Sequence, residues 1–501
     1  MEVCVKNFRL ICVLFSVVSF GACSGSSDSG ATAELDKAVY DAPNLLFADG
    51  IEPGDAAQCE APNGQCWYVD AQAPSGGNGT YSAPYNSFEK VVGYMDAGND
   101  YHSGLIKGGD YLYVRGTFGA EAGQLHLGRG FQGGTPSNPT VIKSWRGFPR
   151  AVFDGGHSRS DLIVVRALSD DLSRGVVIRN VEITRAAGRG IYVDENVEHV
   201  VIEGVVAHDG LGDGFSGVGG GVLLSMVSAS HDFTVRNSLF FNNRVDPKGG
   251  ENNIGGLSIL SEPEAKNGSI VRVYNNTFRD EHIAVRHKHS GRIKMHASGN
   301  LISDSDIGFY VRALDNEIDN NQLVRVGTAF MLVAENQKGD AYANIHDNDV
   351  LDSLVLLDTG YDSTGFERRV DFTNNFYSSS RSVDGIIQLG RYGSNEFDTD
   401  YWNSAGNTFE FDESNSTFLY VEGSAFSAGE AEGVLGDSNL SAEQVQSGAA
   451  ISQAEYVSED DYSEVVEEDF PEEFELPADQ SPEEQERFRN FFENWRWRHR
   501  G

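Results

Sequence analysis

The chain has 501 residues, 57 of them glycine and 13 proline, and 40% are hydrophobic, which is enough to build a sizeable core. This mixture excludes a collagen-like or fully disordered chain and favours a long β structure with many turns. With 75 acidic against 38 basic side chains, the formal net charge is −37. Nucleic acid is therefore not an expected partner, because its phosphates need a basic surface.

Residues 1–22 have the pattern of an export signal. Lys6 and Arg9 precede an apolar run, residues 10–20, that is too short to span a bilayer as a stable helix. The run ends in "FGAC", which resembles a bacterial lipoprotein signal, and the resemblance implies that Cys23 carries lipid. It also implies a lipoprotein of the outer membrane or cell surface of a Gram-negative bacterium, held to the membrane only through the anchor. An ordinary secretory signal is the alternative.

The cysteines after the signal predict one disulfide. Only Cys59 and Cys66 remain once the signal is removed and Cys23 is lipidated. In an oxidising compartment they are expected to pair, and a zinc site is less favoured because no nearby Cys or His completes four ligands. Residues 23–58 begin with the small polar stretch "SGSSDSGATAELDKA" and are expected to form a flexible linker.

Residues 59–445 are predicted to form one repetitive domain. "PYNSFEKVVGYM", at residues 84–95, predicts a helix that caps the first coil. Then come short apolar strands around corners that contain Asn or Asp, as in "VVIRNVEIT" and "VRVYNNTFRD", repeated every 21 to 38 residues. Because long 3.6-period segments are absent, the repeat predicts an all-β solenoid, a parallel β-helix whose coils stack at ~4.8 Å.

The first part of this domain resembles a known superfamily. "WYVDAQAPSGGNGTYSAPYNSFEKVV", "GGDYLYVRGTF" and "TVIKSWRGFPRAVFDGG" resemble the opening segment of right-handed parallel β-helix proteins of the pectate-lyase-like superfamily. The resemblance covers about residues 66–156 well and the repeats to about 440 more generically. It implies a single right-handed β-helix, expected to be monomeric. Its known members include polysaccharide lyases, hydrolases, epimerases and adhesins, so the fold alone does not give the chemistry.

Residues 446–501 are expected to form a disordered acidic tail. Fifteen acidic and no basic side chains lie between Glu455 and Glu486. The tail ends in a short amphipathic helix that begins with a capping box of Ser481 and Glu484. The apolar face of this helix consists of Phe488, Phe491, Phe492 and Trp495. Docking onto the body is favoured over binding a partner or touching a membrane.

Two coils are longer than the others, with extra residues at 208–221 and 242–256. Both insertions fall between the same two strands of adjacent coils, so they are predicted to project from one edge and form a wall of a cleft. Their carboxylates are candidate Ca²⁺ ligands, since Ca²⁺ prefers oxygen. The candidates are Asp209, Asp213, Asp246 and Glu251. Gly-Asp turns without metal are the alternative.

The coil after these insertions carries a positively charged stretch, "IAVRHKHSGRIKMH", at residues 283–296. It holds four Arg or Lys and three His side chains and no acid, in a strongly acidic chain. Alternation along the strand divides its first residues between two faces. Ile283 and Val285 are predicted to point inward, and the residues predicted to point outward are Ala284, Arg286 and Lys288.

Neighbouring coils are predicted to extend this positive surface. Tyr310 and Arg312 of the next coil are expected to stack beside Arg286 and Lys288. Strands before the corner add Arg236, Arg272 and Lys294, giving one patch beside the insertions. Because like charges ~5 Å apart repel, the patch is expected to bind an anionic chain molecule. The alternative is simple neutralisation of Asp280, Glu281, Asp304 and Asp306.

This patch predicts a polysaccharide lyase that cleaves a uronate-containing polysaccharide by β-elimination. The reaction needs a cation at the carboxylate and a base for the neighbouring C5 proton. Arg236, Arg272, Lys294 and Arg312 are candidate substrate-binding residues, and a bound Ca²⁺ is another source of positive charge.

"EHIAVRHKHSG" loosely resembles the strand ending in Arg-His of alginate and chondroitin lyases of this fold. The resemblance implies that Arg286 is the catalytic Arg and His287 its neighbour. Those lyases have a catalytic Lys on the preceding coil, where this chain has "GLSILSEPEAK", with no Lys in the strand. Lys288, His289 and Tyr310 are therefore the candidate bases.

Two other function classes remain open. A glycoside hydrolase on the same fold needs carboxylates about 5–9.5 Å apart, for which Asp304 and Asp306, or Asp209 and Asp213, are candidates. A non-catalytic glycan-binding or adhesive solenoid would use the same patch without turnover.

Overall fold

The computed structural model describes most of the chain between residues 44 and 447. The described ranges are 44–95, 101–122, 124–128, 133–166, 173–194, 197–211, 219–226, 231–243, 254–261, 269–288, 293–312, 315–333, 341–361, 368–381, 384–389, 402–411, 416–421, 424–427, 429–431 and 445–447. The predicted signal, Cys23 and all but the first residues of the acidic tail, with its helix, lie outside them. No helix in these ranges is long and apolar enough to cross a membrane.

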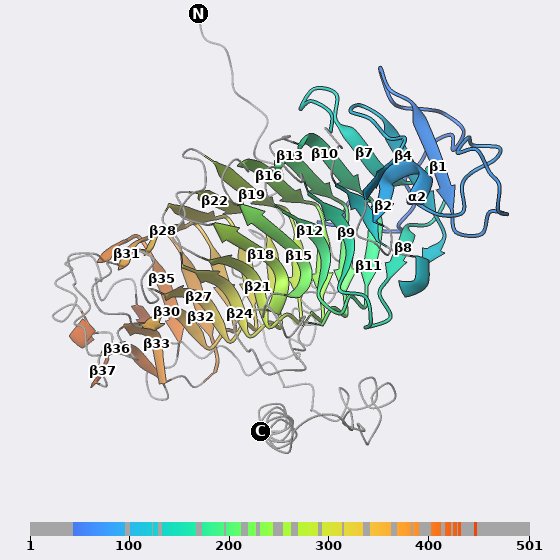
Figure 1. Cartoon of the computed structure of the whole chain (residues 1–501). Helices are drawn as coiled ribbons and strands as arrows, with labels where there is room; N and C mark the ends of the chain where they lie inside the picture. The colour runs from blue at the N-terminus through green and yellow to red at the C-terminus, as the bar shows by residue number, and fades with distance from the viewer. Residues whose placement is uncertain are drawn as a thin grey trace, which may run out of the picture. The chain divides into compact units, whose positions relative to one another are not determined.

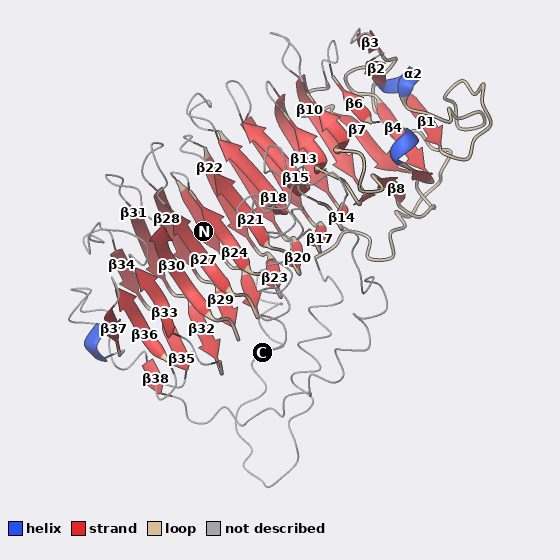
Figure 2. Ribbon diagram, turned by 60° about the horizontal axis from the view of Figure 1, so that its bottom comes forward, coloured by secondary structure: helices blue, strands red, loops and turns tan. Residues whose placement is uncertain are grey.

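Three sheets of twelve strands each run along the described chain, and the chain passes through them in turn (Figures 1 and 2). Strands of neighbouring coils pair in parallel, except for the last strand of the third sheet. Crossovers between parallel strands are almost always right-handed. The fold is therefore the predicted right-handed parallel β-helix.

The sheets are named by their order within a coil. Sheet 1 consists of β1 (Cys66–Asp70), β4 (Tyr111–Arg115), β7 (Thr140–Ser144), β10 (Ser173–Arg179), β13 (Val197–Glu203), β16 (His231–Arg236), β19 (Ile270–Tyr274), β22 (Lys294–Ser298), β25 (Asn316–Asp319), β28 (Ala341–His346), β31 (Arg368–Thr373) and β34 (Trp402–Ala405). Sheet 2 consists of β5 (Thr117–Phe118), β8 (Ala151–Asp154), β11 (Val181–Thr184), β14 (Val206–His208), β17 (Leu239–Phe241), β20 (Thr277–Arg279), β23 (Leu301–Ser303), β26 (Gln322–Val324), β29 (Asp349–Leu351), β32 (Phe376–Ser379), β35 (Thr408–Phe411) and β38 (Val445–Ser447).

Sheet 3 completes each coil. It consists of β6 (Leu125–Leu127), β9 (Asp161–Val165), β12 (Arg189–Val193), β15 (Gly219–Met226), β18 (Ile254–Ser261), β21 (Ile283–Lys288), β24 (Ile307–Val311), β27 (Thr328–Val333), β30 (Val355–Tyr361), β33 (Asp384–Leu389), β36 (Thr417–Val421) and β37 (Ser424–Phe426).

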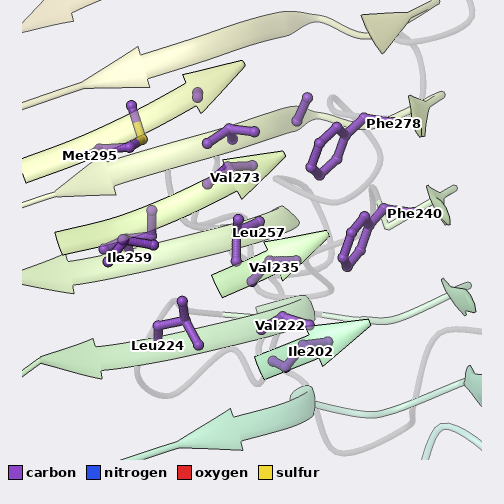
Figure 3. Close-up of a cluster of buried hydrophobic side chains, with 14 of the residues drawn as sticks. Ile202, Val222, Leu224, Val235, Phe240, Leu257, Ile259, Val273, Phe278 and Met295 are labelled. Atoms are coloured by element: carbon purple, nitrogen blue, oxygen red, sulfur yellow. The ribbon is translucent and has the colours of Figure 1, made fainter. Parts of the chain in front are cut away.

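One continuous apolar core fills the space between the sheets. Inward side chains stack on like side chains of the next coil, as the rings of Phe240 and Phe278 do at 4.8 Å between centroids. Figure 3 shows these rings facing aliphatic side chains from the other two sheets, among them Val235 and Leu257. At about 25 cal/mol per Å² of buried apolar surface, this core is the main source of stability.

The corner between sheets 1 and 2 is built on asparagine. A residue in the left-handed region, such as Asn275 (φ 53°) or Asn320 (φ 53°), turns the chain. A fully buried Asn follows it, and its side-chain oxygen accepts a hydrogen bond from the Asn one coil earlier. For example, Asn300 donates its backbone N–H (3.0 Å) and its Nδ2 (2.9 Å) to Oδ1 of Asn321. The ladder consists of Asn276, Asn300, Asn321, Asn348, Asn375 and Asn407.

The predicted capping helix is shorter than expected. Instead of extending over residues 84–95, α2 covers only Glu89–Val92 and leads into β2 (Gly93–Met95), which pairs with β3 (Tyr101–Ser103). Gly93, a poor helix former, follows its last residue. Phe88 nevertheless contacts the ring of Phe118 at 4.4 Å and belongs to the main core, so this segment does pack on the first coils. A short 3₁₀ turn, Ala120–Ala122, also lies here.

Residues 44–58, within the range expected to be a flexible linker, pack on the solenoid. Nζ of buried Lys143 lies 2.7 Å from Glu52 and 2.8 Å from Glu60. Further along, Leu46 donates its backbone N–H to the carbonyl of Asn237 (2.9 Å). The described residues of the predicted linker thus pack against the β-helix. The predicted disulfide between Cys59 and Cys66 is present, with the Cα atoms 5.7 Å apart.

Replacing Asn321 by Ala is expected to lower the free energy of unfolding by about 1–3 kcal/mol, because it removes the acceptor of the buried backbone N–H of Asn300 and one of the two donors to Oδ1 of Asn348. Asn344→Ala, on the partly exposed outer face of sheet 1, is the matched control and should change it by less than about 0.5 kcal/mol. Urea unfolding followed by circular dichroism measures both. Equal midpoints for the two variants would contradict a structural role for the ladder.

Candidate functional site

Sheet 3 is the face bordered by the longest connections. The chain goes from Arg236 to Leu239 between sheets 1 and 2, but from Phe241 to Ile254 before sheet 3. Another long connection, Ser261 to Ile270, follows sheet 3 in the same coil. The insertions at 208–221 and 242–256 both join a sheet 2 strand to a sheet 3 strand of adjacent coils, as predicted. Loops on a rigid scaffold commonly carry function, so sheet 3 is the first place to look.

A row of polar side chains runs along the outer face of sheet 3. In register on successive coils, it contains Ser258, Arg286, Tyr310, Met331, Asp358 and Gln388. Their chain neighbours Val285 and Phe309 belong to the core, so these residues point away from it. Although they face outward, the polar members are buried, with Arg286 1% and Tyr310 8% exposed. Burial of polar groups is costly and frequent at functional sites.

Arg286 and Tyr310 form the centre of this row. Burial lowers the pKa of Arg286 to about 10, while the charge of Tyr310, when ionised, opposes that change. Tyr310 also packs with Ile283 and Val333 in an apolar cluster outside the core. The register that places Tyr310 opposite Arg286 brings Arg312 next to Lys288, and both of these are partly exposed. The predicted stacking of these four residues is therefore found.

Two face assignments in β21 were wrong. Ile283 belongs to the outer apolar cluster and Ala284 to the core, the reverse of the prediction. His287 points inward too, stacked between Ile259 and Val311 of the adjacent coils. His287 cannot be a catalytic residue of the outer face. His289 lies outside the described residues.

His287 has a partner inside the core. Its Nδ1–H donates to Oδ1 of Asn316, 2.6 Å away, and Asn316 in turn donates to the carbonyl of Tyr342 at 2.8 Å. Asn316 occupies an inward position of sheet 1 between Met295 and Ala343. Burial lowers the pKa of His287 to about 4, and the hydrogen bond to Asn316 opposes this. The pair is a neutral polar link between two sheets.

The predicted single positive patch is divided between two faces. Arg236, Arg272 and Lys294 lie on the outer face of sheet 1, whereas Arg286 lies on sheet 3. Arg236 pairs with Glu203 at 2.9 Å and Lys294 with Glu317 at 2.5 Å. Alternation predicted that these side chains point outward, but it could not assign them to a sheet.

Charge neutralisation was the alternative for the patch. Asp304 is held by Nε and Nη2 of Arg325 at 2.7 and 3.0 Å. Asp306 accepts from His282 at 2.8 Å, and buried Glu281 accepts from Asn243 at 2.7 Å. These acids thus have partners other than the cations of β21.

A hydrogen-bonded chain on sheet 1 was not predicted. Oη of Tyr274 lies 2.7 Å from Nδ1 of His296, whose Nε2 lies 3.0 Å from Oδ1 of Asp319. Burial raises the pKa of Tyr274, and nearby Arg272 and Lys294 counteract this. Only the register of β19, β22 and β25 brings the three together, so spacing in the sequence gave no direct signal.

Asp209 is the one candidate metal ligand that the structure describes, and its carboxylate accepts hydrogen bonds from other side chains. Asp209 accepts from Nδ1 of His208 at 2.7 Å and from Nδ2 of Asn242 at 2.5 Å. Asp213, Asp246 and Glu251 lie outside the described residues. Within the described ranges no group of three His, Cys, Asp or Glu side chains is arranged to hold a metal ion. Asp209 therefore does not belong to a Ca²⁺ site among the described residues, and the other three candidates stay a prediction.

His208 is part of an ion-pair cluster on sheet 2. Its ring stacks on Phe241 at 4.5 Å, and Glu182 lies 3.4 Å from its Nε2. Burial alone would lower the pKa of His208, but the hydrogen bonds and charges of Asp209 and Glu182 raise it to about 9. A pKa above 7 favours the charged ring of this partly buried His208 at neutral pH.

Comparison with known proteins gives a likeness in fold. No protein-family model matches the chain, and no curated protein sequence matches it. Among solved structures, a rhamnogalacturonan lyase is 12% identical, with 69% of this chain and 87% of that one covered at a TM-score of 0.43. An alginate lyase from Paenibacillus is 18% identical, covering 64% and 94% at a TM-score of 0.35.

A third structure, pectate lyase Pel9A, is 16% identical, with 88% of this chain and 93% of that one covered at a TM-score of 0.33. At such identities a likeness concerns the fold alone. The three parallel sheets of this chain are the direct evidence for its β-helix fold.

His208 is expected to stabilise the fold below pH 6.5 and to lose this contribution as the pH rises through about 9, because its folded-state pKa is raised. His208→Gln should therefore lower the melting temperature at pH 6.5 much more than at pH 9.5. Thermal unfolding of both proteins at the two pH values measures the difference. A pH-independent effect would show that His208 is neutral in the folded state.

His287 is expected to act in the opposite direction. Its pKa is lowered, so folding favours the neutral ring and stability falls as the pH decreases from 6.5 towards 4. His287→Gln keeps an amide donor for Asn316 but cannot be protonated, so its acid destabilisation over this range should be smaller. Melting temperatures at pH 7 and pH 4.5 test this. An equal loss of melting temperature between these pH values in the two proteins would contradict it.

Proposed function

We propose that the chain is a polysaccharide lyase that cleaves a uronate-containing chain by β-elimination at the outer face of sheet 3. The observation that supports this most is the register pair of Arg286 and Tyr310, with Lys288 and Arg312 beside it. A cation for the carboxylate and an acid–base group for the proton are the two requirements of the reaction. Both occur here on adjacent coils.

In this proposal Lys288 and Arg312 bind the uronate carboxylate, because they are the partly exposed cations of the group. Neutralising the carboxylate stabilises the negative charge that develops when the C5 proton leaves. Tyr310, as the phenolate, removes that proton. The C5 electron pair forms the C4–C5 double bond, the C4–O bond breaks, and Tyr310 returns the proton to the departing oxygen.

Arg286 has an electrostatic role in the proposal. A buried cation acts through a low dielectric, so it favours the ionised form of the neighbouring Tyr310 far more than a solvated cation would. Its own pKa, about 10, keeps it charged at neutral pH. Arg286 thus replaces the Lys expected on the preceding coil, where Ser258 stands.

The glycoside hydrolase alternative has less support. Its candidate carboxylates are engaged elsewhere, Asp304 with Arg325, Asp306 with His282 and Asp209 with His208. A general acid needs a carboxyl group that protonates near neutral pH, and the pKa of Asp209 is lowered by His208 and Asn242, against the effect of burial. A non-catalytic glycan-binding protein is an outcome of the test below.

Tyr310→Phe is expected to reduce kcat for β-elimination by about 10²–10⁴-fold, the usual contribution of a general acid–base group. Lys288→Ala should mainly raise KM. Absorbance of the unsaturated product on alginate, pectate and chondroitin measures both. Tyr342→Phe, the same change on sheet 1, where the hydroxyl donates to Asp371, is the control and should keep wild-type turnover. Folded wild-type protein that forms no unsaturated product on any uronate polymer would refute the lyase.

A further inference from the structure

Sheet 1 carries a hollow that the lyase proposal does not use. It has a volume of about 200 Å³ and lies over β10, β13, β16 and β19. Its lining is Pro136, Pro139, Gly175, Val177, His199, Val201, Asp232, Thr234 and Arg272. Ligand sites for drug-sized molecules measure about 300–1,000 Å³, so this hollow suits one small unit of a longer molecule.

The hollow lies where three neighbouring strands share an unusual backbone. Gly175, His199 and Asp232 occupy matching positions on β10, β13 and β16, between residue pairs that are in register. All three have positive φ, at 62°, 55° and 59°. Glycine adopts this conformation readily, but His and Asp do so at a cost. Strain repeated on adjacent coils at one place is frequent at binding sites.

The chemistry of the lining fits a sugar ring. Val177 and Val201 form an apolar floor on which the C–H face of a pyranose can pack. Around it, Asp232 offers acceptors and Thr234 a hydroxyl for the sugar hydroxyl groups. His199 and Asp232 orient each other, with Nδ1 and Oδ2 3.4 Å apart. An apolar surface with a few directed polar groups is the usual composition of a small-ligand site.

Arg272 adds a positive charge to the lining of the hollow. It makes no ion pair with any residue of the described ranges, unlike Arg236 and Lys294, which pair with Glu203 and Glu317. In a chain of net charge −37, a cation that lines a hollow and has no ion pair within the described part of the chain is unusual. A guanidinium holds a carboxylate with two parallel hydrogen bonds, so Arg272 suits the carboxylate of a uronate.

We infer that this hollow is a second saccharide-binding site, which holds one acidic sugar residue of the polymer on a different sheet from Arg286 and Tyr310. Its ligand class rests on the proposed function. A long chain bound at both places would be retained by two-point attachment, which raises the effective concentration of the second contact without any new chemistry. Short fragments would gain nothing from it.

Binding of acidic trisaccharides from alginate and pectate, measured by calorimetry, tests the site directly. All measurements use the full chain with Tyr310→Phe, so that the ligand is not cleaved. Adding Arg272→Ala should remove one binding event or weaken it on the order of tenfold, the effect of losing a charge-assisted hydrogen bond. Val201→Phe, which fills the floor without changing charge, should do the same, and a neutral cellulose trisaccharide should not bind there.

Arg369→Ala is the matched control, since Arg369 is also on the outer face of sheet 1, is exposed and lies outside the hollow. If Arg272→Ala and Val201→Phe bind the acidic trisaccharides as Arg369→Ala does, the site does not exist. With Tyr310 restored, Arg272→Ala should raise KM on polymer several-fold; an equal KM on polymer also refutes the site.

The two proposals fail separately. Turnover without any effect of Arg272→Ala rejects only the second site. Absence of turnover on every uronate polymer, with trisaccharide binding that depends on Arg272 and Val201, rejects the lyase and leaves a glycan-binding protein. Binding of the neutral and acidic trisaccharides with equal affinity rejects the assignment of Arg272 to a carboxylate.

Discussion

The polar ladders at the two ends of sheet 2 constrain everything else in the solenoid. At the first corner each buried Asn accepts from the coil before and donates to the coil after, as Asn321 does between Asn300 and Asn348. At the second corner Asn243 plays the same part, accepting from the backbone N–H of Gly210 at 2.9 Å and donating to Glu281 at 2.7 Å. A one-residue slip would break these buried hydrogen bonds, so a single register is selected over the coils that carry them.

A fixed register at the corners decides which outward side chains meet. Arg286 faces Tyr310 because sheet 2 cannot slide, and the same constraint aligns His199 with Asp232 on sheet 1. The largest differences in coil length fall in the connections that border sheet 3. A β-helix in this way separates a rigid frame, which positions chemical groups, from connections that differ between coils.

The sequence predicted the coils and corners of the β-helix better than the direction in which individual side chains point. Repeats with Asn at the corner are visible in the sequence because the corner needs a left-handed residue and a buried amide, as at Asn275 and Asn276. The face of a residue close to a corner is harder to predict, because a left-handed residue such as Asp280 shifts the phase of alternation. Ile283 and Ala284 were misassigned for this reason. His287 could be placed inside only by knowing that Asn316, on another sheet, offers it a partner.

The cations on the two faces differ in how strongly salt screens their interactions. Arg286 is almost completely buried, so its interaction with Tyr310 is little screened by salt. Arg272 lines an open hollow and attracts an anion through solvent, where screening at physiological ionic strength acts over about 8 Å. An anion held by Arg272 should therefore be bound more weakly at high salt, whereas the effect of buried Arg286 on Tyr310 should change little. For the proposed acidic polymer, attraction would be concentrated at a few such points of this acidic chain, and the remaining surface would repel it.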